Sequence, residues 1–219
     1  MQNHLLLEDI SIMNELNIFG MGGHSLVIQS IAKKLNYKIL NLFDDNLNYK
    51  NLDNYKGNFQ DMINYNQDKN IENIIAIGDN LVRKEKIEIL SSLNINIVTL
   101  IDQSSNISQN VSIGKGTIVM PGCNINAKTT IGKGCIINTG SNIDHENEIG
   151  NFVHISPGCN LAGQVKIGDV TWIGIGTNII NNINIGKNVF VSAGLKIYND
   201  IEDNVRVYDE HSLKYKKND

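Results

Sequence analysis

The sequence predicts a small α/β domain of Rossmann-like type over residues 1–100, followed by an all-β parallel β-helix over residues 101–202. Two observations predict this order. Strand-like and helix-like segments alternate in the first half, and an aliphatic residue recurs at every sixth position in the second half. Residues 203–219 are expected to form a C-terminal tail. Residues 1–12 are expected to be an extension, because Met13 begins a segment that reads as a more usual start.

The first domain is predicted from short apolar segments of two kinds. Runs of consecutive apolar residues read as strands, and segments with apolar residues at helical spacing read as helices. Their alternation is typical of a parallel sheet covered by helices. We expect strands at Leu16–Gly20, Lys38–Asp45, Glu72–Asn80 and Ile95–Ile101, helices at Ser25–Lys34 and Leu81–Leu93, and a polar loop at Asn46–Asn70.

A period of six residues governs the second half of the chain. It fits neither an α-helix nor an ordinary alternating strand. It is the signature of a parallel β-helix, in which short strands meet at tight corners and one aliphatic side chain per hexad points inward. The series ends at Asp203 and comprises Ile101, Ile107, Ile113, Val119, Ile125, Ile131, Ile137, Ile143, Ile149, Ile155, Leu161, Ile167, Ile173, Ile179, Ile185, Val191 and Ile197.

A longer period of eighteen residues is superimposed on the hexads. The dipeptide Ile-Gly recurs at this spacing, starting at Ile113, Ile131, Ile149, Ile167 and Ile185. The structural unit is therefore three hexads, which form one triangular coil. Abundant Gly and Asn suit the corners, because both residues tolerate left-handed backbone geometry. Stacked coils bury an aliphatic column and pair each strand with the coils above and below it.

Composition excludes several classes of partner. The formal net charge of −4 argues against nucleic acid or an anionic membrane surface. No apolar run approaches the roughly 18 residues that a membrane span requires. The three cysteines, Cys123, Cys135 and Cys159, lack metal-type spacing, and their odd number suits a reducing compartment. We therefore expect a cytoplasmic protein.

Three segments that suit ligand binding follow predicted strands of the first domain. They are Gly20–Ser25, Asp44–Asp45 and Gly78–Asn80. In parallel sheets, ligands bind at the carboxyl ends of the strands, so these segments are expected to share one site.

The Gly-rich turn indicates the kind of ligand. Glycines between a strand and a helix bring backbone N–H groups close to a phosphate, although packing alone also explains such a turn. Asp44 and Asp45 lie where a ribose or base is hydrogen-bonded, and His24 either contacts phosphate or has no role. Ser25 occupies the place of the third glycine of G-x-G-x-x-G. We therefore expect a nucleotide-sugar rather than a nicotinamide dinucleotide.

Two histidines stand out in the repeat, because a repeat built for stability alone has no need of an acid–base pair. His145 is flanked by Asp144 and Glu146, with Glu148 nearby, and His154 follows nine residues later. A carboxylate in hydrogen-bond reach fixes the tautomer of an imidazole and raises its basicity. A zinc site of the γ-class carbonic anhydrase kind needs three histidines, and the repeat contains only these two, so we expect no metal.

At these residues the chain resembles a known family along nearly its whole length. The motifs are those of the PglD/NeuD-type sugar acyltransferases, which join a nucleotide-sugar-binding domain to a left-handed hexapeptide β-helix. The resemblance implies a homotrimer with acetyl-CoA bound between adjacent helices. It rests on FGMGGHS, FDDN, IAIGDN, INTGSNIDHENEIGNFVHISPGCNLAGQVKIG and WIGIGTNII.

The resemblance also implies a role for individual residues. His145 is the implied general base, and Glu146 the carboxylate that raises its basicity. The chain departs from the family at its end, where VRVYDEHSLKY from Val205 replaces a G-x-P-A-like segment. The implied acetyl-CoA contacts are His154, Gly163, Ile175, Ala193 and Gly194, and the implied nucleotide-sugar contacts are Gly22, Gly23, His24, Asp44, Asp45, Gly78 and Asn138.

The expected function is an acetyl-CoA-dependent N-acetyltransferase in surface glycan biosynthesis. Its acceptor would be a UDP-, dTDP- or GDP-linked 4-amino-4,6-dideoxy sugar. The nearest alternative keeps the fold and acetylates a hydroxyl of a sialic-acid-like sugar. A non-enzymatic scaffold is disfavoured because the His–Glu pair is intact, and a dehydrogenase because no hydride-transfer partner follows the first domain.

Overall fold

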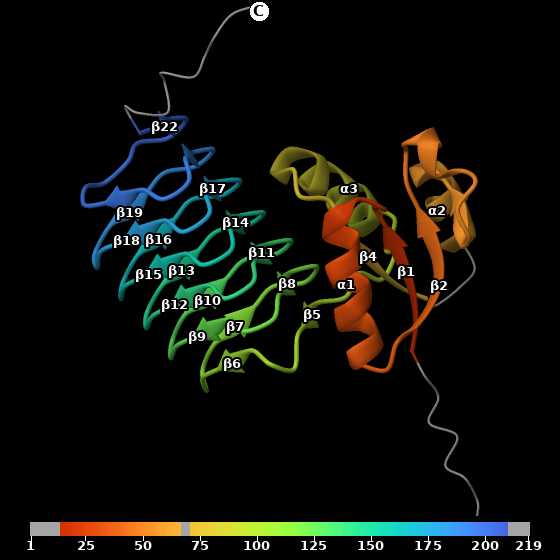
Figure 1. Ribbon diagram of the computed structural model, residues 1–219, viewed down its shortest axis with the longest axis horizontal. Helices are drawn as coiled ribbons and strands as arrows, with labels where there is room; N and C mark the ends of the chain where they lie inside the picture. Colours follow the sequence, from red (N-terminus) through yellow and green to blue (C-terminus); the bar gives the residue numbers. More distant parts are fainter. Residues whose placement is uncertain (1–13, 67–70, 210–219) are drawn as a thin grey trace, which may run out of the picture.

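The computed structural model describes residues 14–66 and 71–209. The chain forms an α/β layer that packs against one side of a long stack of coils (Figure 1). No helix in the described part of the chain is long and apolar enough to cross a membrane. The predicted extension at residues 1–12 and the end of the predicted tail, residues 210–219, lie outside the described residues.

The N-terminal layer is a parallel sheet with helices packed on it. Among the described residues the sheet has four strands in the order β3-β2-β1-β4. The strands pair in parallel, and β1, β2 and β4 contain buried residues because helices cover them, whereas the edge strand β3 is more exposed. The elements are β1 (Glu15–Phe19), α1 (Gly23–Lys34), β2 (Lys38–Phe43), β3 (Tyr55–Gly57), α2 (Phe59–Asn66), β4 (Glu72–Ile75) and α3 (Asn80–Ser92).

The segment Asn46–Asn70, predicted to be a loop, contains regular structure, so that prediction was wrong. A 3-10 turn, η1 (Leu47–Tyr49), precedes β3 and α2. Phe59, Met62 and Ile63 bury one face of α2, at helical spacing. Many Asn and Asp residues surround these three apolar residues, which is why composition concealed the helix.

The predicted strand Ile95–Ile101 is also not a regular strand. Ile97 makes a single parallel bridge with Asn73, and the chain then leaves the sheet. Leu100 and Ile101 instead form β5 (Leu100–Ile101), which pairs with the next coil of the stack. The first part of this apolar segment pairs with the N-terminal sheet, and its last two residues pair with the β-helix. The sequence pattern does not show where the chain passes from one domain to the other.

The remaining chain forms three parallel sheets that fit the expected left-handed β-helix. Each coil contributes one two-residue strand to each sheet, so residues eighteen apart lie over one another. In the described residues the seven-stranded sheet contains β5, β8 (Ile118–Val119), β11 (Ile136–Ile137), β14 (His154–Ile155), β17 (Trp172–Ile173), β20 (Phe190–Val191) and β22 (Arg206–Val207). The six-stranded sheet contains β6 (Asn106–Ile107), β9 (Asn124–Ile125), β12 (Asn142–Ile143), β15 (Asn160–Leu161), β18 (Asn178–Ile179) and β21 (Lys196–Ile197). The five-stranded sheet contains β7 (Ser112–Ile113), β10 (Thr130–Ile131), β13 (Glu148–Ile149), β16 (Lys166–Ile167) and β19 (Asn184–Ile185).

The inward side chains form one continuous core. The predicted aliphatic series from Val119 to Ile197 belongs to a single buried cluster, and Ile101, Ile107 and Ile113 pack against it at lesser burial. The corners take positive φ at every sixth residue, even at Val170 (φ 65°) and Phe152 (φ 57°). Such bulky side chains are rare in this backbone region, so tertiary packing holds these two corners.

The stack continues beyond the predicted boundary at residue 202. Ile201 bridges to Ile185, and β22 pairs with β20. Both pairings span sixteen residues instead of eighteen, because the last coil is two residues shorter at its corner after Ile197. This deletion ended the period of six at Asp203 although the fold continued.

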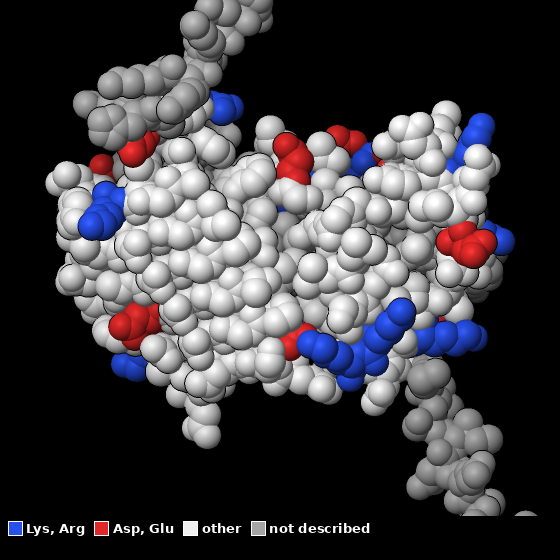
Figure 2. Space-filling model, in the orientation of Figure 1, with Lys and Arg blue, Asp and Glu red and all other residues white. Residues whose placement is uncertain are grey.

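The α/β layer lies on the seven-stranded sheet. Leu100, Ile118 and Met120 share a core with Leu16 and Ile28. On the face in Figure 2, basic side chains gather along the lower edge next to an acidic one, and the other charged side chains are scattered. Apolar packing is therefore one of the contacts that join the two domains.

We expect Ile155→Ala to lower the free energy of unfolding by about 2–5 kcal/mol, because it leaves a cavity in a close-packed column. Ile180→Ala is the matched control, since Ile180 is 42% exposed, whereas Ile155 is fully buried. Urea unfolding measures both variants. Equal losses of unfolding free energy in the two variants would contradict the assignment of Ile155 to the buried core.

Candidate functional site

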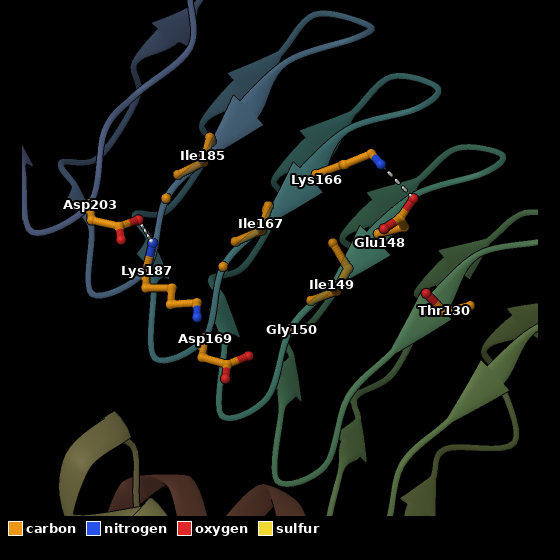
Figure 3. Close-up of a pocket in the computed structure, with 12 residues that line it drawn as sticks. Thr130, Glu148, Ile149, Gly150, Lys166, Ile167, Asp169, Ile185, Lys187 and Asp203 are labelled. Atoms are coloured by element: carbon orange, nitrogen blue, oxygen red, sulfur yellow. Dashed lines mark hydrogen bonds and ion pairs between the residues drawn. The ribbon is translucent and has the colours of Figure 1, made fainter.

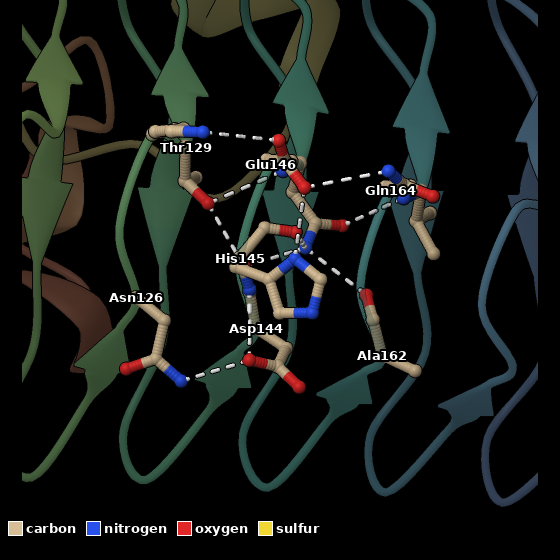
Figure 4. A network of polar contacts seen from close by, with 10 residues as sticks. Asn126, Thr129, Asp144, His145, Glu146, Ala162 and Gln164 are labelled. Carbon is tan, nitrogen blue, oxygen red and sulfur yellow. Dashed lines mark hydrogen bonds and ion pairs between the residues drawn. The ribbon is translucent and has the colours of Figure 1, made fainter.

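His145 lies at a corner of the stack, on the turn between β12 and β13 (Figure 4). Asp144 shapes this turn: its Oδ1 accepts from the backbone N–H of His145 at 2.8 Å and from Asn126 Nδ2 at 3.0 Å. The hydrogen bond from Asn126 is the largest of the influences that lower the pKa of Asp144. The ring of His145 is 55% exposed and does not enter the aliphatic column.

His145 and Glu146 form the expected pair. His145 Nδ1 lies 3.2 Å from Glu146 Oε2, and Glu146 has a left-handed backbone (φ 58°) that turns its side chain beside the ring. Gln164 Nε2 donates to the same carboxylate at 3.3 Å, and Lys128 Nζ lies 3.5 Å from its other oxygen. The hydrogen bond with His145 leads the influences that lower the pKa of Glu146. A carboxylate at Nδ1 holds the proton there and leaves Nε2 free to accept one.

Gly163 lies under His145, one coil further along the stack. A Cβ atom built on Gly163 would lie 2.6 Å from Cε1 and 2.7 Å from Nε2 of His145. The glycine has no positive φ, so its backbone conformation does not require glycine. Other coils carry Gln109, Ala127 and Asn181 at the same corner position. The ring of His145 is therefore what excludes a side chain here.

His154 belongs to a different part of the molecule. It lies on β14 in the sheet that the α/β layer covers, is 6% exposed, and stacks on Trp172 with ring centroids 4.9 Å apart. Asn138 Nδ2 lies 3.1 Å from His154 Nε2. The ring of His24, at the start of α1, lies 6.5 Å away. Asn138, His24 and His154 therefore lie close together. The resemblance assigns His154 to acetyl-CoA and the other two residues to the nucleotide-sugar.

Both of these histidines are uncharged at neutral pH. Burial lowers the pKa of His154 to about 3, with Arg83 and His24 adding to the effect and the Gly78 backbone opposing it. Burial and then Arg83 lower the pKa of His24 to about 4. His24 Nε2 and His154 Nδ1 are buried and have no hydrogen-bond partner among the described residues. A buried polar atom without a hydrogen-bond partner destabilises the fold unless a ligand or a water molecule supplies the hydrogen bond.

The Gly-rich turn is open at the start of α1. The helix begins after Gly22 without a side-chain cap, and Cβ atoms built on Gly22, Gly23 or Gly78 would meet nothing within 4 Å. Backbone N–H groups at a free helix N-terminus suit a phosphate. Gly22 and Gly23 follow β1, and Gly78 follows the adjacent strand β4, so all three lie near the carboxyl ends of neighbouring strands.

Asp44 and Asp45 already make structural contacts. Asp44 accepts from the backbone N–H groups of Met21 and Asn46, both at 2.7 Å. Asp45 accepts from the N–H of Phe59 at 2.9 Å and lies 3.3 Å from Lys86 Nζ. Each carboxylate retains lone pairs, so structural use and ligand binding are compatible.

The remaining predicted acetyl-CoA contacts lie at a second corner of the stack. Ile175 follows β17, and Ala193 and Gly194 follow β20, so they sit one coil apart between the seven-stranded and six-stranded sheets. Ile175 is 56% exposed. One chain therefore does not bring them to His145, which lies at the corner opposite the seven-stranded sheet.

A shallow groove runs beside the His145 corner, and a second groove lies on the adjacent five-stranded sheet. One of about 430 Å³ is lined by Glu146, Gln164 and Asn182, with Glu148 and Lys166 at its edge. The other, of about 420 Å³, crosses the five-stranded sheet (Figure 3). The ion pair between Lys166 and Glu148, at 2.9 Å, stands beside both. The described residues contain no cluster of His, Cys, Asp or Glu that could hold a metal ion.

Sequence reasoning missed Arg83 and Trp172. Trp172 lies within the quoted motif WIGIGTNII, and its position eighteen residues after His154 could have placed it over that ring. Arg83 gave no signal, because a basic residue on a helix next to Lys84 reads as solvated surface.

Comparison with known proteins confirms the predicted resemblance. Residues 15–90 match the family model of the PglD N-terminal domain. PerB from Caulobacter crescentus, solved with CoA and GDP-perosamine, superposes with a TM-score of 0.82 at 28% identity, covering 88% of this chain and 93% of that chain. The acetyltransferase domain of PglB from Neisseria gonorrhoeae, solved with acetyl coenzyme A, gives 0.81 at 28% identity, covering 89% and 95%.

A third structure supports the fold alone. WeeI from Acinetobacter baumannii superposes with a TM-score of 0.79 at 21% identity, covering 90% of this chain and 98% of that chain. A search of curated proteins finds no match.

We expect stability to fall as the pH drops from about 6.5 toward 4. In that window the unfolded chain protonates His24 and His154 and the folded chain does not, because their folded pKa values are about 4 and 3. The loss at pH 5 is about 2 kcal/mol for each histidine. Urea unfolding at pH 7 and pH 5 measures it, and His154→Gln should flatten the dependence. An unchanged slope in that variant would contradict the buried neutral state of His154.

Proposed function

We propose, from the resemblance to the PglD/NeuD-type sugar acyltransferases, that this chain is an acetyl-CoA-dependent N-acetyltransferase. Its acceptor is the amino group of a nucleotide-linked 4-amino-4,6-dideoxy sugar. The observation that carries the proposal is His145, exposed beside Glu146 at 3.2 Å and seated over Gly163. PerB binds CoA and GDP-perosamine, and the PglB domain binds acetyl coenzyme A, which supports both substrate classes.

The reaction begins with a proton transfer. A 4-amino sugar is largely protonated at neutral pH and cannot attack until it loses a proton. His145 Nε2 removes this proton, while Glu146 holds Nδ1–H and stabilises the imidazolium that forms. The free amine then attacks the thioester carbonyl, and a new C–N bond forms.

The collapse of the tetrahedral intermediate breaks the C–S bond. The backbone N–H of Gly163 supplies a donor for the developing oxyanion, next to His145. Coenzyme A leaves as a thiolate, which takes the first proton from His145. The neutral ring then accepts the second proton, which the nitrogen loses as it becomes an amide, and releases it to water. The products are the acetamido sugar, free coenzyme A and one proton, and His145 returns to its neutral form.

The active site is proposed to lie between subunits of a homotrimer. In one chain, His145 occupies the corner opposite the sheet that carries His154 and the α/β layer. Ile175, Ala193 and Gly194 occupy another corner. A base, a cofactor groove and an acceptor cleft on three sides of one coil meet only when copies of the chain pack side by side.

The finer assignments follow from this reading. His154, Gly163, Ile175, Ala193 and Gly194 are proposed to contact acetyl-CoA. The nucleotide-sugar is proposed to bind Gly22, Gly23, His24, Asp44, Asp45, Gly78 and Asn138. We further propose that residues 1–100 are a Rossmann-like acceptor domain, that the coils form the acyltransferase domain, and that the enzyme acts in the cytoplasm in surface glycan synthesis.

An O-acetyltransferase acting on a sialic-acid-like sugar is the second candidate. The base and donor would be the same, because a hydroxyl also needs a proton acceptor. The open α1 N-terminus with its glycines favours an acceptor that carries phosphate, and hence the nucleotide-linked sugar.

An acceptor screen separates the two candidates. We expect thiol release from acetyl-CoA with at least one of the UDP-, dTDP- or GDP-linked 4-amino sugars and none with free sialic acid. A colorimetric thiol assay measures release, and mass spectrometry of the product shows whether nitrogen is acetylated. Activity on sialic acid alone would favour the O-acetyltransferase over the N-acetyltransferase.

We expect His145→Ala to lower kcat by about 10²–10⁴-fold, because it removes the general base. The ring is exposed, so the variant should fold and assemble as the parent chain does, which size-exclusion chromatography with light scattering checks. A kcat within threefold of the parent would remove His145 from the mechanism.

Gly163→Ala tests the same ring without removing it. The added methyl group displaces the imidazole, so kcat should drop at least about tenfold while stability changes by less than about 0.5 kcal/mol. Asn181→Ala, at the equivalent position of the next coil, is the matched control and should keep full activity. A displaced but fully active His145 would argue against its role as the base.

A further inference from the structure

Arg83 is a buried cation at a place where a cation is costly. It has the largest side chain among the fully buried residues and lies in the first turn of α3, where the helix dipole disfavours positive charge. Burial lowers its pKa to about 10, so the guanidinium remains charged at neutral pH. Removing such a charged group from water costs several kcal/mol, and its place in α3 does not offset this cost.

All five N–H groups of the guanidinium are satisfied. Nε donates to the carbonyl of Gly134 at 2.7 Å, and Nη2 donates to the carbonyl of Phe152 at 3.0 Å and to Asn80 Oδ1 at 2.7 Å. Nη1 donates to the carbonyls of Ile77 at 3.1 Å and Gly78 at 2.9 Å. None of these five acceptors is a carboxylate. The set uses the planar fork of arginine, which the three donors of a lysine cannot reproduce.

These bonds fasten one loop to the stack of coils. Gly134 and Phe152 are corner residues of two successive coils, and Asn80 Nδ2 adds the carbonyls of Val170 and Thr171 in the third at 2.9 and 3.1 Å. The loop from Ile77 to Asn80 joins β4 to α3 at the carboxyl edge of the sheet. Its position relative to the coils is therefore set by Arg83 and Asn80.

The fastened loop faces His154. Asn138 Oδ1 accepts from the N–H of Thr139 at 2.8 Å, which identifies Nδ2 as the atom that donates to His154 Nε2. The neutral ring then carries its proton on Nδ1. Arg83 donates to the carbonyl of Phe152, close before His154 in the chain, and Asn80 donates to that of Thr171, next to Trp172. The Gly78 backbone also raises the pKa of His154, as an acceptor beside Nδ1–H would. The carbonyl of Gly78 is one that Arg83 holds.

We propose that Arg83 is a positioning residue for the acceptor cleft, which fixes the loop Ile77–Asn80 so that Gly78 and the rings of His24 and His154 keep their places. Its effect on catalysis rests on the proposed function, whereas its effect on the loop does not. Its fixed charge, 2.9 Å from the Gly78 carbonyl, also disfavours protonation of both rings. Asp79 and Cys135 are the titratable groups that interact with the guanidinium itself.

The competing view is that Arg83 only joins two domains. Lys34 offers a matched comparison, because its Nζ lies 2.9 Å from Asp102 Oδ2 and links α1 to the coils away from the cleft. Trp172 offers a local probe, because it is the one tryptophan of the sequence and stacks on His154. Its fluorescence reports on that stack without any substrate.

The test compares Arg83→Lys and Arg83→Met with Lys34→Met. We expect the Arg83 variants to change the fluorescence of Trp172 and the imidazole ¹⁵N shifts of His154, which would no longer report a single Nδ1–H tautomer. The acceptor KM should rise by at least about tenfold in Arg83→Lys. Lys34→Met should lower Tm and leave all of these readouts at parental values.

Each outcome of this comparison either supports or contradicts the proposed role of Arg83. Parental fluorescence and ¹⁵N shifts in Arg83→Lys, or the same changes in Lys34→Met, would overturn the proposal. If Arg83→Met does not fold, Arg83→Lys still carries the test, because it keeps the charge and loses the fork. If no nucleotide-sugar is acetylated by the parent chain, the proposed function fails, and the spectroscopic readouts still decide the role of Arg83.

Discussion

The eighteen-residue register of the coils is the constraint from which the rest of the structure follows. One aliphatic residue in six must point inward, so each coil closes after three hexads and the next coil lies directly over it. Any residue thus gains a neighbour eighteen positions away. Gly163 lies under His145 and Trp172 stacks on His154 for this reason, and both pairings shape the candidate site. Where the register shortens to sixteen, the stack survives, because the hydrogen-bond ladder is kept through Val207.

A three-sided coil also separates functions in space. The sheet that receives the α/β layer carries His154 and Trp172, and the opposite corner carries His145 and Glu146. These groups cannot meet within one chain, since the packed aliphatic column stands between them. This separation is the physical argument for the proposed homotrimer. In that assembly, copies of the chain that pack side by side would bring the proposed base to the proposed acceptor cleft.

The two kinds of histidine illustrate how burial divides chemical roles. His145 is exposed and its Nδ1 faces a carboxylate, an arrangement that suits its proposed role as the base. His24 and His154 are buried near the charge of Arg83, and burial and this charge both favour their neutral forms. One nitrogen of each ring has no hydrogen-bond partner among the described residues. Neutral imidazoles serve as hydrogen-bonding groups for a polar ligand, not as bases near neutral pH. The cost of burying Arg83 without a carboxylate is offset by five hydrogen bonds to the loop and the coils.

The sequence alone determined the β-helix, its period, the strands and helices that flank the Gly-rich turn, and the His145–Glu146 pair, because all of these depend on residues close in the chain or on a strict repeat. It did not determine α2, where three apolar residues hide among polar ones, or the path of residues 95–101, which pass from one domain to the other. Only the tertiary structure decided that His24 faces His154 and that Arg83 lies buried between the domains. These contacts join residues that no period relates, so packing of one domain against the other created them.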